Sequence, residues 1–191
     1  MAIFVTSDLH FGHDREFVWG ARGYADVEEM NREQIRKFNE VVGPEDEVWI
    51  LGDLMLGDRE KGIECVKQLN GKIHICLGNH DTGTREKLYN ELGFDVQLAA
   101  RFKYKKLNFY LSHFPTDGTN LNVENIWETN LCLYGHTHQT GNFYKGNPYI
   151  YHVGVDSHDG YPVSMDQVIA DIKAEMERCK ELLYEKEDLA E

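Results

Sequence analysis

Three side chains that can act together in a reaction stand next to one another in the run Leu77-Gly78-Asn79-His80-Asp81. An asparagine offers a neutral oxygen to a metal ion, a histidine gives or takes a proton, and an aspartate can orient that histidine. The run follows residues 72–77, where Ile73 and Ile75 alternate with other residues and predict a strand that ends in a turn. Open α/β sheets place their chemistry at the carboxyl ends of strands. The same residue types are also common in plain turns, so the run alone does not decide between the two.

Acidic and imidazole side chains also follow four other apolar stretches. Asp8 and His10 come directly after residues 2–6, and because alternate residues of an extended chain face the same side, both can reach one metal ion. The alternative at each place is a polar residue that only turns the chain. This alternative would require the same coincidence to occur independently at five places. The remaining residues in this position are Asp53 after residues 47–51, His113 after residues 107–112, and His136 and His138 after residues 131–134.

The stretches between these residues predict an α/β fold. Residues 26–42 have apolar side chains at helical spacing, with Asp26 in the position of an N-cap. Residues 58–69 predict a second helix, which begins at Asp58 and is stopped by Asn70-Gly71. These two helices alternate with the strands predicted at residues 2–6, 47–51 and 72–77, and this order predicts a parallel sheet with right-handed crossovers. Residues 84–92 predict a third helix.

The second half of the chain predicts a second sheet and a long final helix. Residues 94–104 and 107–112 predict an antiparallel hairpin around Lys105-Lys106, and residues 131–134 and 148–155 predict two further strands. The pattern Ser164-x-x-Gln167 predicts a capping box, so a long helix is expected from about residue 164. Its apolar stripe indicates core contacts, with a partner-binding face as the alternative. One domain over residues 1–191 is expected.

Composition limits the partners that this chain can attract. Hydrophobic residues make up 41% and aromatic residues 12%, as in ordinary folded proteins. The 20 Lys and Arg residues against 33 Asp and Glu residues give a charge of -13, which opposes binding to long nucleic acid or an anionic membrane. An anionic substrate therefore needs a local positive charge. With neither a leader pattern nor a stretch approaching the ~20 apolar residues of a membrane helix, a cytoplasmic protein is expected. The four cysteines form no C-x-x-C pair and predict neither a disulfide framework nor a zinc knuckle.

Taken in order, the five motifs resemble those of the calcineurin-like metallophosphoesterases. The family pattern is D-x-H, G-D, G-N-H-D/E, a histidine, and G-H-x-H. The segments Ser7-Asp8-Leu9-His10-Phe11-Gly12-His13 and Ser112-His113-Phe114-Pro115 also resemble small stand-alone bacterial and phage members. The resemblance implies a four-layer αββα sandwich of two mixed β-sheets flanked by helices. The matching residues here are Asp8-Leu9-His10, Gly52-Asp53, Gly78-Asn79-His80-Asp81, His113 and Gly135-His136-Thr137-His138.

The resemblance implies a site for two divalent metal ions that share Asp53. Mn(II) is the expected ion, and Fe, Zn, Co or Ni also suit the ligand types. With two carboxylates among the ligands, the loaded centre carries a charge of about +2. This local charge supplies the attraction that the acidic composition lacks. The implied ligands are Asp8, His10, Asp53 and His138 for one ion and Asp53, Asn79, His113 and His136 for the other.

The implied reaction is attack on phosphorus by a hydroxide that bridges the two metals, in line with the leaving oxygen. His80 is then a catalytic residue and not a ligand: it protonates the leaving group or stabilises charge, while Asp81 holds its other nitrogen. Three further residues, His13, Arg22 and Asn31, are candidates for substrate contact. His74, His152 and His158 match no motif and stay unassigned.

The expected activity is that of a phosphatase or phosphodiesterase on a small phosphate ester. Without an obvious cap domain the site is expected to be open, which gives no reason for tight selectivity. A non-catalytic metal-binding scaffold for a protein partner and a nuclease are the alternatives. The oligomeric state is not predicted, because the long last helix can cover its own sheet or meet a second copy.

Overall fold

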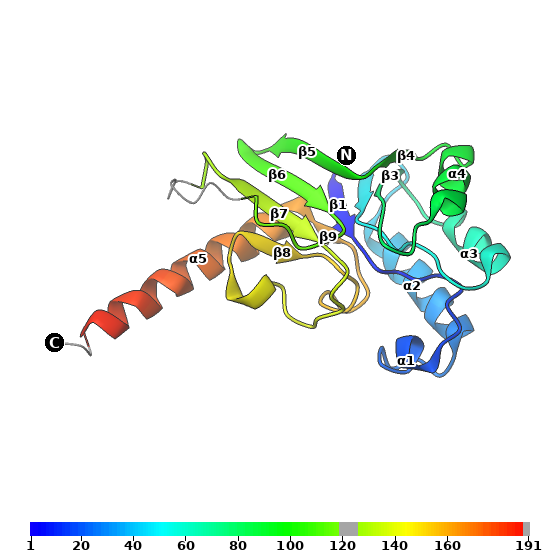
Figure 1. The fold of residues 1–191 in the computed structure, drawn as a ribbon, viewed down its shortest axis with the longest axis horizontal. Coiled ribbons are helices and arrows are strands. Elements are labelled where there is room, and N and C mark those ends of the chain that lie inside the picture. Colours follow the sequence, from blue (N-terminus) through cyan, green and yellow to red (C-terminus); the bar gives the residue numbers. More distant parts are fainter. Residues whose placement is uncertain (119–125, 189–191) are drawn as a thin grey trace.

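Two mixed β-sheets form the centre of the computed structural model, which describes residues 1–118 and 126–188 (Figure 1). The first sheet has the order β4-β3-β2-β1-β9 and the second has the order β5-β6-β7-β8. The strands of the first sheet are β1 (Ile3–Thr6), β2 (Glu47–Ile50), β3 (Lys72–Cys76), β4 (Asp95–Gln97) and β9 (Val163–Ser164). Those of the second are β5 (Ala99–Tyr104), β6 (Leu107–Ser112), β7 (Asn130–Tyr134) and β8 (Ile150–His152).

Parallel pairing brings several strand ends to the same edge of each sheet. Strands β1, β2, β3 and β4 are parallel, and only the short β9 joins β1 in the antiparallel direction. In the second sheet β6, β7 and β8 are parallel, while β5 forms an antiparallel hairpin with β6. The loops that leave β1, β2 and β3 therefore emerge together, as do those that leave β6, β7 and β8.

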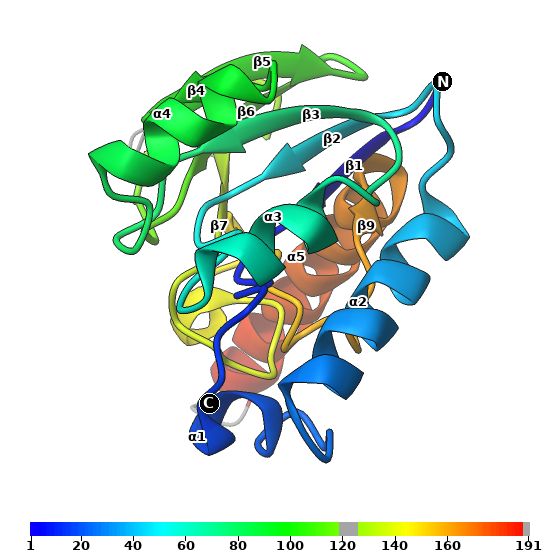
Figure 2. The ribbon, with the colours of Figure 1, turned by 90° about the vertical axis from the view of Figure 1, so that its right-hand side faces the viewer.

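Helices flank the sheets, as expected from the sequence. Figure 2 shows α2 (Val27–Val41) and α3 (Arg59–Val66) in front of the first sheet, with the second sheet behind it. On this face Phe38 of α2 and Tyr89 of α4 (Gly83–Glu91) share a buried cluster with Ile50 and Ile75 of the sheet. The expected α/β sandwich of two mixed sheets flanked by helices is thus confirmed. A short helix that the sequence did not predict, α1 (Glu16–Trp19), precedes α2.

The last helix, α5 (Met165–Asp188), contributes to the core between the two sheets and then extends beyond them (Figure 1). Its residues Val168 and Ile172 are buried in one cluster with Val5 of the first sheet and Leu133 of the second. Ser164 caps the helix, since its Oγ accepts a hydrogen bond from the N–H of Gln167 at 3.2 Å. The side chain of Gln167 does not complete the predicted capping box, and its amide NH2 group donates to Asp171.

One predicted strand is divided between the two sheets. Residues 94–104 form β4, which pairs with β3, and then β5, which pairs with β6. Leu98 stands between them and is 79% exposed. The local alternation is continuous through this crossing, so the sequence predicted one strand where the chain passes from one sheet to the other. Within the described residues, no helix combines the length and the apolar character needed to cross a lipid bilayer.

Candidate metal centre

The carboxyl ends of six strands meet at one edge of the sandwich. The loops after β1, β2 and β3 supply acidic, amide and imidazole side chains, and the loops after β6, β7 and β8 supply the rest. Ser7 and Gly154 form a parallel bridge between the two sheets at this edge, and the N–H of Val155 donates to the carbonyl of Ser7 at 3.1 Å. This bridge fixes the two sets of loops against each other. The seven metal-ligand candidates predicted from the sequence all lie in these loops.

Several of these candidates have an unusual backbone conformation. Nine non-glycine residues of the described chain have positive φ angles, and five of them are Asp8, His10, Asp53, His136 and His138. A left-handed conformation costs such a residue about 1–2 kcal/mol. Backbone strain of this kind is concentrated at functional sites, where the surrounding structure maintains it.

Asp8, His10 and His138 form one group. The Nε2 atoms of His10 and His138 lie 3.2 Å apart, and Nε2 of His138 lies 3.9 Å from Oδ1 of Asp8. Asp8 is fully buried, and its carboxylate accepts hydrogen bonds from Ser7 Oγ at 2.6 Å and from the N–H of His136 at 2.9 Å. The loop that carries His136 and His138 is thereby tied to the end of β1.

Asn79, His113 and His136 form a second group. Oδ1 of Asn79 lies 2.8 Å from Nε2 of His113 and 2.8 Å from Nδ1 of His136, and these two nitrogens are 3.2 Å apart. Nδ1 of His113 lies 2.8 Å from the carbonyl oxygen of Leu51 and donates to it in the tautomer that carries its proton on Nδ1. This tautomer leaves the lone pair of Nε2 directed at the group.

Asp53 lies between the two groups. Its Oδ2 is 3.5 Å from Nε2 of His113 and 3.9 Å from Nε2 of His10. Its Oδ1 accepts a hydrogen bond from the N–H of His80 at 2.9 Å, which leaves Oδ2 facing the imidazoles. One carboxylate oxygen is therefore close to both sets of nitrogens, as a residue shared by two ions requires.

Two motif glycines are required because side chains of the site lie directly against them. A Cβ on Gly135 would lie 1.8 Å from Ser7 Oγ and 2.6 Å from Asp8 Oδ2. A Cβ on Gly78 would lie 2.3 Å from Oδ1 of Asp53. The glycines of the motifs that contain Asn79 and His136 thus allow the loops to approach the carboxylates.

Burial sets the protonation of the site. It lowers the pKa of His10 to about 2, with help from the charge of Arg22, so this ring is neutral. Burial also lowers the pKa of His136 and raises that of Asp8, against the opposing effect of His138. Neutral imidazoles are the form that binds metal ions.

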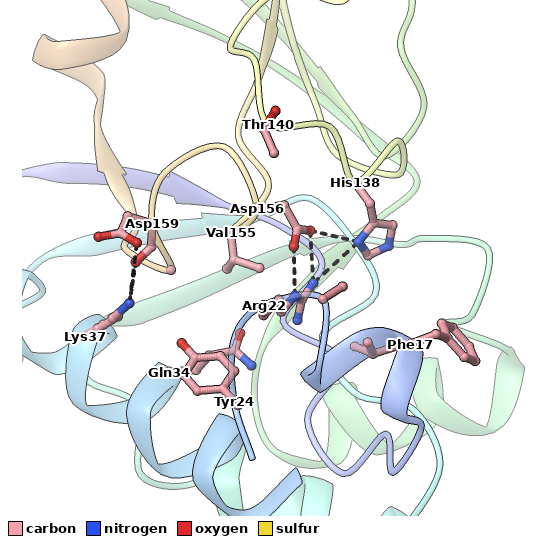
Figure 3. A pocket seen from close by; sticks show the side chains of 13 residues that line it. Phe17, Arg22, Tyr24, Gln34, Lys37, His138, Thr140, Val155, Asp156 and Asp159 are labelled. Atoms are coloured by element: carbon pink, nitrogen blue, oxygen red, sulfur yellow. Dashed lines mark hydrogen bonds and ion pairs between the residues drawn. The ribbon is translucent and has the colours of Figure 1, made fainter. Parts of the chain in front are cut away.

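A three-residue network that the sequence reasoning missed supports His138. Oδ2 of Asp156, in the loop after β8, lies 2.8 Å from Nδ1 of His138 (Figure 3). Arg22 holds the same carboxylate with Nε at 2.8 Å and Nη2 at 3.0 Å, and it also donates to the carbonyl of Asp8 at 2.7 Å. Burial alone would raise the pKa of Asp156, but its bonds to His138 and Arg22 prevail and the pKa lies well below its usual range. A charged carboxylate that accepts from Nδ1 leaves Nε2 of His138 free to bind a metal.

His80 lies at the open side of the site, with 45% of its side chain exposed. Its Nε2 is 4.0 Å from Oδ2 of Asp53. The sequence prediction that Asp81 holds the ring of His80 is wrong in this structure. Both oxygens of Asp81 accept other hydrogen bonds: Oδ2 from the N–H groups of Asp53 and Gly78, and Oδ1 from the hydroxyl of Tyr89 at 2.8 Å. Asp81 thus fixes the loops that carry the site and does not contact the imidazole.

The three predicted substrate contacts occupy different positions. His13 lies beside the site, with its ring centre 5.5 Å from that of His10. Arg22 is 8% exposed, and its N–H groups are engaged by Asp156 and by the carbonyls of Asp8 and Leu9. Asn31 is buried, and its Oδ1 accepts a hydrogen bond from the N–H of Gly12 at 3.2 Å. A phosphate contact would require Arg22 to give up one of these bonds, whereas in Asn31 it would involve the amide NH2 group and not the oxygen that Gly12 occupies. The substrate roles of all three residues stay predictions.

The donor set fits divalent transition-metal ions. Imidazole nitrogens as close as those of His10 and His138 repel each other through their lone pairs unless a proton or a cation lies between them. The same holds for the lone pairs of Asn79, His113 and His136, and the nitrogen and oxygen donors suit Mn, Fe, Zn, Co or Ni. All four cysteines are free and lie outside this set.

Comparison with known proteins gives the family of this chain. The profile of the calcineurin-like phosphoesterase superfamily domain matches residues 1–173. An uncharacterized protein of Methanocaldococcus jannaschii is 31% identical over 175 residues, which cover 87% of this chain and 89% of the archaeal protein. The gene 66 protein of Mycobacterium phage L5 is 31% identical over 192 residues, which cover 85% of this chain and 90% of the phage protein.

A solved structure shows the same fold. It is that of a protein of unknown function from Aquifex aeolicus, with a TM-score of 0.65 and 20% identity, over 88% of this chain and 98% of the other. The family profile covers both sheets, and the five motifs occur in order around one site. This chain therefore belongs to the calcineurin-like phosphoesterase superfamily.

Proposed function

We propose that this chain is a dinuclear phosphoesterase that hydrolyses small phosphomonoesters or phosphodiesters. The observation that carries the proposal is the position of Asp53 between two groups of side chains, with its Oδ2 3.9 Å from Nε2 of His10 and 3.5 Å from Nε2 of His113. Potential ligand atoms of Asp8, His10 and His138 lie within 4.8 Å of one another, and so do those of Asp8, Asp53 and His113. Family membership supports hydrolysis of a phosphoester, and the two groups support a pair of ions.

Each ion would be held by ligands from both sheets. The ions, with Mn(II) as the proposed metal, would supply an activated water and neutralise the oxygens of the phosphoryl group. Their charge would also attract an anionic ester to a chain whose net charge is -13. The proposed ligands are Asp8, His10, Asp53 and His138 for one ion and Asp53, Asn79, His113 and His136 for the other.

His80 is the proposed proton donor to the leaving oxygen. Its exposure lets the ring reach a bound ester, and its backbone N–H holds the residue beside Asp53. Asp81, which accepts hydrogen bonds from the hydroxyl of Tyr89 and the N–H of Asp53, holds the loop that carries His80. These bonds position the imidazole without contacting it. A proton given at the leaving oxygen contributes about 10²–10⁴-fold to such reactions.

Turnover of two chromogenic esters tests the proposal. With Mn(II) added, p-nitrophenyl phosphate and bis(p-nitrophenyl) phosphate report monoester and diester hydrolysis of the same alcohol. We expect activity on at least one of them, loss of that activity after removal of metal by a chelator, and loss in Asp53→Asn. Equal and very slow turnover of both esters, unchanged by Asp53→Asn, would contradict the proposal.

A further inference from the structure

A pocket of about 590 Å³ opens directly beside the metal centre. Its wall includes His138, whose Nε2 faces His10 at 3.2 Å, and the Arg22–Asp156 pair that supports His138. Sites for small organic ligands have volumes of about 300–1,000 Å³. The pocket is therefore much larger than a phosphate group needs, and it shares a wall with the place where we propose that the phosphate binds.

The charges in this wall cancel one another. Figure 3 shows His138 and the Lys37–Asp159 pair at opposite ends of the pocket, with Arg22 and Asp156 between them. Arg22 binds Asp156 through two hydrogen bonds. Nζ of Lys37 donates to the carbonyl of Asp159 at 2.6 Å and lies 3.9 Å from its carboxylate. Each cation of the wall thus already has an acidic partner before a ligand binds.

The rest of the wall is mainly apolar. Val18 and Tyr24 come from the segment around α1, and Val155 comes from the loop after β8. Val18 and Val155 are buried in the clusters beneath the pocket, so this wall is held in place by the core. A neutral group that enters the pocket exchanges water for apolar surface, whereas a charged group loses its hydration without gaining a partner.

We propose that this pocket receives the neutral, ring-bearing organic group of the substrate while its phosphate lies at the metal centre. The proposal rests on the proposed phosphoesterase function and narrows its substrate class. The preferred substrates are phosphate esters of a neutral alcohol that carries a ring, as aryl alcohols and nucleosides do. Polyphosphates and polynucleotides bring further negative charge to a wall without a free cation, and they are poor substrates.

Binding of phosphonates, which cannot be hydrolysed at the P–C bond by this reaction, tests the pocket without depending on turnover. The full chain loaded with Mn(II) is titrated calorimetrically with methylphosphonate and with phenylphosphonate. We expect phenylphosphonate to bind about tenfold to a hundredfold more tightly, as burial of a phenyl group predicts. A carboxylate added at the far end of the ring should weaken binding by about tenfold, because it is desolvated without a free cation.

Variants of the exposed residues Ala21 and Thr140 show where the ring binds. Both line the pocket and neither belongs to the proposed metal ligands. Ala21→Trp and Thr140→Trp each place an indole in the pocket from a different wall, so one can serve if the other does not fold. Each should remove the preference for phenylphosphonate and leave methylphosphonate binding within twofold of wild type. Ala21→Ser is the matched control and should keep the preference.

Three results would overturn the proposal, and they differ in meaning. Equal binding of the two phosphonates by wild type refutes the pocket but leaves the phosphoesterase function intact. Tighter binding of the carboxylated ring refutes the neutral character of the wall and shows that Lys37 is available to anions. Binding of neither phosphonate to the metal-loaded chain refutes the pocket together with the proposed function.

Discussion

Replacing Asp156 with asparagine tests whether His138 is held in the form that binds metal. Both oxygens of Asp156 accept from N–H groups: Oδ1 from Nε of Arg22, and Oδ2 from Nη2 of Arg22 and from Nδ1 of His138. An asparagine has nearly the same shape, but its NH2 group faces a donor in either orientation. Where it faces His138, Nδ1 must become the acceptor and the proton moves to Nε2, the nitrogen proposed to bind metal.

The expected loss follows because the asparagine either reverses this tautomer or supports it with a neutral oxygen in place of a charged carboxylate. Residues that orient a ligating histidine contribute about 10–100-fold to metal affinity. This factor corresponds to about 1.4–2.8 kcal/mol of binding free energy. Arg22, which is 8% exposed, also loses the charge that compensates it. We therefore expect the free energy of unfolding of Asp156→Asn to fall as well, by up to about 3 kcal/mol.

A competition titration of Mn(II) against a coloured chelator measures the affinity, and Asp159→Asn is the matched control. Asp159 lies in the same loop, is 95% exposed, and has its carboxylate 3.9 Å from Nζ of Lys37. Its substitution removes the same charge three positions away without a contact to His138. The control should bind Mn(II) within about twofold of wild type.

The pH dependence separates a local effect from general loss of structure. The hydrogen bond to Asp156 raises the pKa of His138, and since a metal ion requires the neutral ring, binding weakens as the pH falls through this raised pKa. In Asp156→Asn the pKa of His138 falls, so this weakening begins at a lower pH although binding at high pH is poorer. An Asp156→Asn protein with wild-type Mn(II) affinity at every pH would show that Asp156 does not hold His138 in its metal-binding form.

Three further substitutions test other parts of the site. Gly135→Ala places a Cβ 1.8 Å from Ser7 Oγ and should lower the unfolding free energy by more than about 2 kcal/mol in urea titrations; Gly141→Ala, which meets open space, should be neutral. His80→Ala should keep fold and metal content but reduce turnover by about 10²–10⁴-fold, and unchanged turnover would exclude His80 as the proton donor. Burial lowers the pKa of fully buried His152 to about 4, below the ordinary value of about 6.5. Between these pH values the unfolded chain binds a proton that the folded chain does not. The free energy of unfolding of the metal-free wild type should therefore fall by up to about 3 kcal/mol as the pH falls from 6.5 to 4, and His152→Asn should lack this decrease. The same dependence of unfolding free energy on pH in both proteins would contradict this.

The positions of the metal-ligand candidates could be predicted because local patterns determine strand ends. A short apolar stretch followed by an acid or a histidine marks such an end, and parallel pairing brings the ends together. The turn after β3 shows this: Asn79 lies against His113 and His136, which are distant in sequence. Helix caps also depend on neighbouring residues only. The side chain of Asp26 accepts a hydrogen bond from the N–H of Glu29 at the start of α2, as the sequence predicts.

Tertiary hydrogen bonds could not be predicted in this way. Asp81 follows His80 directly, so spacing favoured a contact between them, but Tyr89 and the N–H groups of Asp53 and Gly78 take both carboxylate oxygens. Asp156 belongs to no motif, and its partner Arg22 is 134 residues away. One signal was available: Asp156 directly follows the predicted strand of residues 148–155, as the other acids follow theirs.

An anomalous difference map from crystals grown with Mn(II) shows directly whether two ions share Asp53. We expect two peaks of comparable height. One should lie between Asp8, His10 and His138, the other between Asn79, His113 and His136, and both should contact the carboxylate of Asp53. Crystals of Asp53→Asn should lose at least one peak. A single peak in wild type at saturating Mn(II), or two peaks of which neither contacts Asp53, would contradict a pair of ions bridged by this residue.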